Sequence, residues 1–125
     1  STAAAARQHT ISQDHVDPYL QILGELSRAH GFEVIVAIFP LFDDPSIFGD
    51  LQDYHLRDEH ARVTLSASAA GLQTLDLLQD FQACERDNPE GLAIDQTHPN
   101  RAGHRCAGEA IARYLMDESR AMERP

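Results

Sequence analysis

The feature of this sequence that most limits its fold is the apolar, β-branched run FEVIVAIF at Phe32–Phe39, which Pro40 ends. A run of this kind, without polar alternation, is typical of a strand buried on both faces in a parallel sheet. A second run, LQTLDLL at Leu72–Leu78, predicts another short strand. With helices expected around both strands, the order indicates an α/β fold with a parallel sheet.

Two helices are expected before the second strand. Asp17 followed by Pro18 predicts a helix start, and apolar residues then recur at helical spacing until Gly31, a suitable C-terminal glycine. The segment Leu51–Ala70 has helical propensity, and Gly71 is expected to end it in the same way.

The remaining segments are expected to be loops, apart from one helix. Pro40–Gly49 contains two prolines and predicts a loop after the first strand, where open α/β sheets place their sites. Asp80–Gly91 is polar and is expected to be irregular. The last helix is predicted at Asn100–Ser119, with an inner face made of Ala107, Ile111, Tyr114 and Leu115.

The chain has 125 residues, of which 42% are hydrophobic, enough for one domain with a core. We expect a flexible N-terminal segment at 1–12, an α/β domain at 13–119 and a tail at 120–125. No stretch is long and apolar enough for a membrane span, and the first residues lack the pattern of a signal peptide. The sequence therefore predicts a soluble protein, without indicating its compartment.

The charged residues exclude several functions. The net charge is -10, and all ten cationic residues are arginines, because the sequence contains no lysine. Schiff-base and Walker-lysine chemistry are therefore excluded. The arginines are scattered in an acidic chain, so nucleic acid is not an expected partner.

Cysteine and histidine spacing gives no metal site. Cys84 and Cys106 are not in a C-x-x-C arrangement, and they could be two ordinary thiols or a single disulfide. The sequence contains seven histidines. The spacing of a helical zinc site is found neither between His55 and His60 nor between His98 and His104. We expect these histidines to be adventitious and no metal or cofactor to be bound.

The most informative stretch is DQTHPNRAGH, which begins at Asp95. An aspartate three residues before a histidine can accept a hydrogen bond from the imidazole Nδ1, which fixes the tautomer and leaves Nε2 free to act as a base. Pro99 disfavours helix at His98, and Asn100 is a good N-cap for the helix that follows. We predict that Asp95 and His98 form a hydrogen-bonded pair at the C-terminal edge of the sheet.

The pattern D-x-x-H-P-N-x-x-G-H, after a strand and before an Ala-rich helix, resembles the last conserved block of SGNH (GDSL-type) hydrolases. The likeness covers most of residues 13–118. It implies the C-terminal half of a three-layer, flavodoxin-like fold, and hydrolysis of a small-molecule ester without a cofactor. In that family the aspartate and histidine complete a triad with a serine, so the resemblance implies Asp95 and His98 as catalytic residues.

The nucleophile of such a triad is unknown here. In the family it lies in a Gly-Asp-Ser block, and other blocks supply the oxyanion-hole residues; none can be matched in this sequence. The tripeptide Gly49-Asp50-Leu51 has leucine in the place of the serine. Ser66 and Ser68 fall in a predicted helix without a sharp strand-to-helix turn, and Ser46 lies on the loop after the first strand.

Two alternatives to a catalytic domain stay open. The chain could be a non-catalytic or degenerate α/β module, or it could work with a partner polypeptide that supplies the nucleophile. Two strands alone would leave unpaired edges, so we expect a second chain or a second copy to complete the sheet. The sequence does not indicate the ester that would be hydrolysed.

Overall fold

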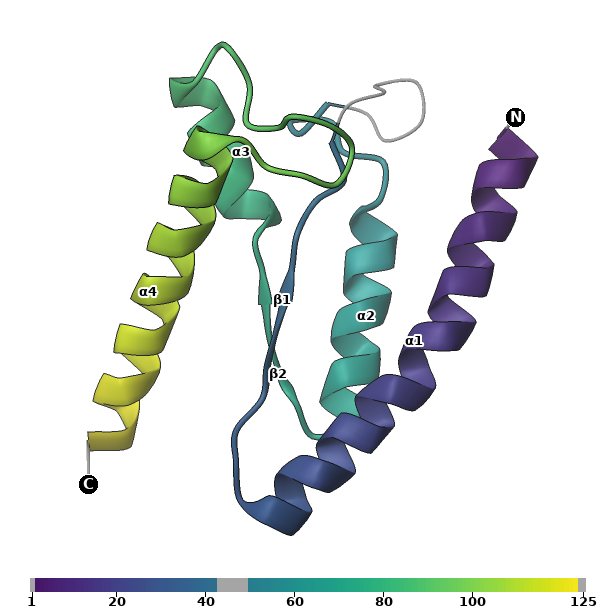
Figure 1. The fold of residues 1–125 in the computed structure, drawn as a ribbon, viewed down its shortest axis with the longest axis vertical. Helices are drawn as coiled ribbons and strands as arrows, with labels where there is room; N and C mark the ends of the chain where they lie inside the picture. Colours follow the sequence, from purple (N-terminus) through teal and green to yellow (C-terminus); the bar gives the residue numbers. More distant parts are fainter. Residues whose placement is uncertain (1, 43–49, 124–125) are drawn as a thin grey trace. The chain divides into compact units, whose positions relative to one another are not determined.

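The computed structural model describes the backbone of residues 2–42 and 50–123 and the side chains of residues 16–42 and 50–119. The described elements, in chain order, are α1 (Thr2–His30), β1 (Ile35–Ile38), α2 (Arg57–Ala69), β2 (Gln73–Asp76), α3 (Leu78–Asp87) and α4 (Arg101–Glu123) (Figure 1). They form two compact units. The first comprises residues 1–38 and 55–76, and the second comprises residues 39–54 and 77–125.

The first unit contains the parallel sheet. β1 and β2 pair in parallel from Ile35 opposite Gln73 to Ile38 opposite Asp76, and α2 connects them (Figure 1). The expectation of a mixed α/β chain with a parallel sheet is confirmed. The four residues of β1 are half-buried, so the expectation of a strand buried on both faces is wrong for the described chain, in which β2 is the one partner of β1.

The first helix is longer than expected. It begins at Thr2, and Pro18 lies inside it, so the predicted start at Asp17 is wrong. The Ala run at residues 3–6 favours a helix at the start of the chain, and the helix continues through Pro18 although proline lacks a backbone donor. The carboxylate of Asp17 instead accepts a hydrogen bond from the Ser66 hydroxyl on α2 at 2.7 Å. The end at Gly31 is confirmed, because this residue has a φ of 70° and donates its N–H to Ser27.

A close approach of two backbones fixes α1 against α2. A Cβ at Gly24 would lie 2.2 Å from the carbonyl oxygen of Ala70, so only glycine fits there. The same oxygen accepts a hydrogen bond from Arg28 at 3.0 Å. The buried residues of this unit gather around this crossing: Leu20, Ala67, Ala70 and Leu72, with Val34 and Val36 packed against them.

The helix α2 is shorter than expected. It begins at Arg57, and the predicted start at Leu51 is wrong, because Leu51 and Tyr54 are buried in the second unit. The hydroxyl oxygen of Tyr54 accepts the backbone N–H of Leu41 at 2.9 Å. The helix does end where Gly71 predicts, with a φ of 78°.

The second unit contains a helix that the sequence analysis missed. Leu78–Asp87 forms α3, so the expected irregular structure at Asp80–Gly91 is wrong over most of its length. Its buried face consists of Leu78, Phe81 and Gln82, at the spacing of a helix. The ring of Phe81 contacts those of Phe39 and Phe42, with centroids 5.9 and 5.4 Å apart.

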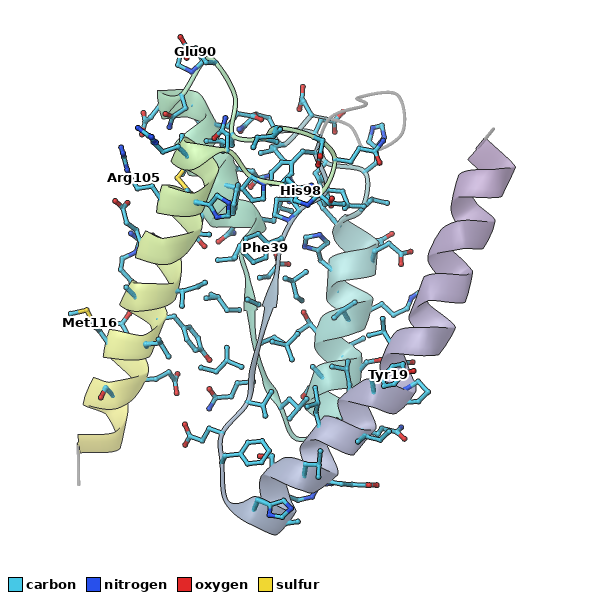
Figure 2. The ribbon with its side chains drawn as sticks, in the orientation of Figure 1. Tyr19, Phe39, Glu90, His98, Arg105 and Met116 are labelled. Carbon is cyan, nitrogen blue, oxygen red and sulfur yellow. A yellow bond between two sulfur atoms is a disulfide. The ribbon has the colours of Figure 1, made fainter. Side chains whose placement is uncertain are left out.

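A disulfide joins α3 to α4. Cys84 and Cys106 are bonded to one another, which resolves the alternative that their spacing left open. Figure 2 shows this bond in yellow close to Arg105. The last helix begins one residue after Asn100, as expected, and buries Ala107 and Ala110, whereas Leu115 is exposed, contrary to its predicted place on the inner face. None of the described helices has the length and apolar character needed to cross a membrane.

Candidate functional site

The predicted Asp-His pair lies on a narrow loop between α3 and α4. The backbone N–H of Ile94 donates to the carbonyl of His98 at 2.8 Å, and that of Asn100 donates to Leu92 at 2.8 Å. Ala93 and Pro99 face one another as an antiparallel bridge between these bonds. The loop is therefore a small hairpin whose tip consists of residues 94–98.

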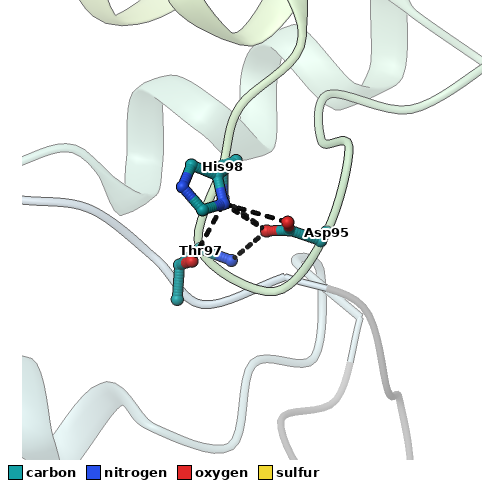
Figure 3. A network of polar contacts seen from close by, with 3 residues as sticks. All are labelled: Asp95, Thr97 and His98. Carbon is teal, nitrogen blue, oxygen red and sulfur yellow. Dashed lines mark hydrogen bonds and ion pairs between the residues drawn. The ribbon is translucent and has the colours of Figure 1, made fainter.

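The carboxylate of Asp95 organises this tip. Its Oδ1 atom accepts the backbone N–H groups of Thr97 and His98, each at 3.0 Å (Figure 3). The same oxygen lies 2.7 Å from Nδ1 of His98, and Oδ2 lies 2.9 Å from it. The predicted hydrogen bond between Asp95 and His98 is thus present, and the carboxylate also has the local role of stabilising the turn.

This geometry favours the ionised form of Asp95 and one tautomer of a neutral His98. The N–H of Thr97, followed by the hydrogen bond from the His98 ring, lowers the pKa of Asp95 below its ordinary value of 3.8. An ionised Asp95 requires the hydrogen of a neutral His98 to sit on Nδ1, so that Nε2 carries the lone pair. Within the described residues no hydrogen bond engages Nε2.

The pair is exposed, which limits its electrostatic strength. The side chain of His98 has 71% of its surface accessible and that of Asp95 has 55%. Solvent screens an ion pair at such a position, so its value here lies in orientation more than in energy. The hydroxyl of Thr97 lies 3.2 Å from Nδ1 of His98, on the same side of the ring as the carboxylate (Figure 3).

Asn100 ties the hairpin to the start of α4. Its side-chain oxygen accepts the N–H of Gly103 at 3.0 Å, which confirms the predicted N-cap. Its side-chain nitrogen donates to the carbonyl of Gly91 at 3.1 Å. Because Asn100 follows His98 by two residues, these bonds fix the base of the loop relative to the helix.

Gly103 also has a defined reason to be glycine. A Cβ at this position would lie 2.2 Å from the carbonyl oxygen of Leu92 and 2.8 Å from the Cβ of Pro99. The P-N-x-x-G part of the motif is therefore the set of residues that packs the hairpin onto α4. In this structure it carries the loop on which Asp95 and His98 face one another.

The segment that follows β1 contacts the tip of the hairpin. The backbone N–H of Phe42 donates to the carbonyl of Gln96 at 2.9 Å. Ser46, which belongs to the same segment, and Gly49 lie outside the described residues. The Gly-Asp-Leu sequence does not form a nucleophile turn at its described end, because Leu51 is buried and Asp50 accepts the N–H of Asp53.

The two other serines considered as nucleophiles lie in α2, as predicted. Ser66 donates its hydroxyl hydrogen to Asp17, and Ser68 is exposed on the same helix. Neither is at a strand-to-helix turn of the kind that presents a nucleophile. The nucleophile of a triad is not identified among the described residues.

A second histidine–carboxylate pair was missed by the sequence analysis. His60, on the first turn of α2, is buried, and its Nδ1 atom lies 2.9 Å from Oδ1 of Asp76, the last residue of β2. The sequence analysis considered His60 only as a possible metal ligand and did not pair it with a carboxylate. Asp76 at the end of a predicted strand was the available signal, but nothing local links it to a residue on the preceding helix.

The described residues contain no cluster of three or more histidine, cysteine, aspartate or glutamate side chains that could hold a metal ion. Two surface pockets of the described chain are lined by the Asn88–Gly91 turn, the first turns of α4 and the two cysteines. The side chains of Asp95 and His98 are themselves exposed to solvent.

Comparison of the chain with protein-family models, with characterised proteins and with solved structures gives no match. The function must therefore be inferred from the geometry of the Asp95–His98 loop and from the motif that forms it.

Proposed function

We propose that this chain is part of an ester hydrolase of the SGNH type, in which His98 is the general base and Asp95 the residue that orients it. The observation that carries the proposal is the contact of both Asp95 carboxylate oxygens with Nδ1 of His98, at 2.7 and 2.9 Å. The three-residue spacing and the pattern D-x-x-H-P-N-x-x-G-H support it.

In this mechanism Nε2 of His98 takes the proton of a serine hydroxyl as the serine oxygen attacks the ester carbonyl. The imidazolium then gives that proton to the departing alcohol, and an acyl-serine remains. A water molecule, deprotonated by the same Nε2 atom, hydrolyses the acyl-serine and regenerates the serine. Asp95 keeps its negative charge throughout and stabilises the imidazolium of each step.

The proposal includes a three-layer, flavodoxin-like fold around a wider parallel sheet. The parallel pairing of β1 and β2, with α2 as their connection, supports it. The half-buried, entirely apolar β1 supports the further expectation that another chain or copy adds to the sheet. The serine and the oxyanion-hole donors would come from a Gly-Asp-Ser segment or equivalent, in the same or a partner polypeptide.

A non-catalytic role is the alternative, and one observation favours it. Oδ1 of Asp95 accepts two backbone N–H groups, so the carboxylate would be useful in the turn even if His98 did nothing. A substitution that keeps an acceptor oxygen but changes the partner of His98 separates the two roles. Asp95→Asn can still bind both N–H groups, whereas Asp95→Ala cannot.

The test is hydrolysis of short p-nitrophenyl esters and labelling by a fluorophosphonate. The 125-residue chain alone is expected to show neither, because an Asp-His pair without its serine keeps little of the rate enhancement. Joined to, or mixed with, a polypeptide carrying a Gly-Asp-Ser block, it is expected to show both. His98→Ala should then lower turnover by a factor on the order of 10³ or more, and Asp95→Asn should lower it less.

His104→Ala is the matched control. His104 is exposed, belongs to the same motif, and is tied to its neighbours through its backbone N–H, which donates to Asn100. Its replacement is expected to leave turnover unchanged. Equal losses in the His98 and His104 variants, or full activity after His98→Ala, would refute the role of His98 as the base.

A further inference from the structure

The disulfide encloses the candidate site in a covalent ring. Cys84 of α3 and Cys106 of α4 are 22 residues apart, and the segment between them contains the Asn88–Gly91 turn, the hairpin with Asp95 and His98, and the first turn of α4. The loop that pairs the two side chains is therefore closed at its base by an S–S bond.

A continuous set of contacts links this bond to His98. Cys106 lies on the second turn of α4, whose first turn is capped by Asn100. Asn100 also holds Leu92 and Gly91 through its backbone and side-chain nitrogens, so it closes the neck of the hairpin. A displacement of the start of α4 would therefore open the neck, and with it the turn that brings His98 to Asp95.

Without the disulfide the neck depends on noncovalent contacts, the hydrogen bonds of Asn100 and the packing of Gly103, while other contacts keep α3 and α4 folded. The ion pair between Arg113 and Asp80, at 3.2 Å, is partly exposed and contributes little. Buried Phe81 on α3, and buried Ala107 and Ala110 on α4, lie further from the hairpin along the chain than the two cysteines do. Loss of the bond should therefore loosen residues 85–105 locally and leave the helices in place.

The disulfide is also accessible to a reductant. Cys84 and Cys106 line a surface pocket together with Asp87, Asn88, Ala102, Arg105 and Glu109. Cys84 is partly exposed whereas Cys106 is buried, so an incoming thiolate would reach Cys84 first. The charged side chains of this pocket are one cation, Arg105, and two carboxylates, Asp87 and Glu109.

We propose that the Cys84–Cys106 disulfide is a redox-controlled cross-link that keeps Asp95 and His98 in hydrogen-bonding contact. A dithiol reductant attacks Cys84 through one thiolate, forms a mixed disulfide and releases the Cys106 thiolate. Its second thiol then forms the reductant's own disulfide and releases Cys84. The protein gains two electrons and two protons, the cross-link is broken, and His98 loses its fixed contact with Asp95. The inference concerns the pairing itself and holds whether or not the pair acts on an ester.

The test follows the ring nitrogens of His98 by ¹H–¹⁵N NMR in the 125-residue chain, oxidised and after phosphine reduction, with Cys84→Ser/Cys106→Ser as a permanently open form. In the oxidised protein we expect the Nδ1–H tautomer of His98 to predominate. In the two open forms we expect ring ¹⁵N shifts averaged between the two tautomers, a change that reoxidation of the wild-type chain reverses.

His60 is the internal control, because its Nδ1 atom also faces a carboxylate, that of Asp76 at 2.9 Å, but lies outside the ring. Its signals should not change on reduction, and far-UV circular dichroism should retain the helices. Unchanged His98 signals on reduction would overturn the proposal. So would equal loosening of His60 and His98, which would indicate general unfolding, or two alkylatable thiols in protein purified without reductant.

Discussion

Gly103 lies so close to Leu92 that a Cβ at residue 103 would be 2.2 Å from the carbonyl oxygen of Leu92. This approach joins α4 to the hairpin that carries Asp95 and His98. A backbone oxygen cannot move aside as a side chain can, so the hairpin and the helix would have to separate to admit a methyl group.

We therefore predict that Gly103→Ala destabilises the chain by about 1–3 kcal/mol, as overpacking against backbone does, and disturbs the His98 ring signals. Gly108→Ala is the control on the same helix, because a Cβ there meets nothing within 4 Å. It is expected to stabilise the helix by roughly 0.5–1 kcal/mol. Urea unfolding of both variants measures the effect, and similar behaviour of the two would contradict the close packing at Gly103.

The ionised carboxylate of Asp95 should make the stability of the chain depend on pH in the acid range. The N–H of Thr97 and the His98 ring hold the pKa of Asp95 below 3.8. A group with a depressed folded-state pKa contributes stability that is fully present above its unfolded pKa and is lost as pH falls through the folded one. The difference in unfolding free energy between wild type and Asp95→Asn should therefore decrease as pH falls below about 3.8 and through the lowered pKa of Asp95.

The direct measurement is the ¹³C carboxyl titration of Asp95. A midpoint below the ordinary value of 3.8 is expected. A midpoint at or above 3.8 would show that the hydrogen bonds of the turn do not favour the ionised form.

The pair of Asp95 and His98 could be predicted because it depends on three residues of chain and one proline. The parallel strands and the ends of α1 and α2 were predictable for a similar reason, since an apolar run or a single glycine determines each. The helix α3 was missed because Leu77 and Leu78 extended the apolar run of β2, although a helix begins at Leu78. Its buried face depends on Phe39 and Phe42, which are distant in sequence.

The buried pair of His60 and Asp76 shows what tertiary structure adds, because 16 residues separate its members. We predict that Asp76→Ala costs about 1–3 kcal/mol, since it removes an acceptor of a buried imidazole nitrogen. Asp76→Asn, which keeps an acceptor oxygen, should cost less. The exposed Asp117→Ala should change stability by less than about 0.5 kcal/mol. Chemical unfolding of the three variants at neutral pH gives the order, and equal costs for Asp76→Ala and Asp117→Ala would contradict the buried hydrogen bond.

The last prediction concerns association through the sheet. In the described chain β1 has one partner strand, and its four apolar residues are only half-buried. Unpaired strand edges beside exposed apolar surface are a template for pairing with another chain. We expect light scattering at micromolar concentration to give at least twice the mass of the chain, and amide hydrogens of β1 and β2 to lose protection on dilution. Amides in the middle of α2, whose bonds are internal to the helix, should keep theirs at every concentration. A monomer whose strand amides exchange independently of concentration would show that two strands suffice.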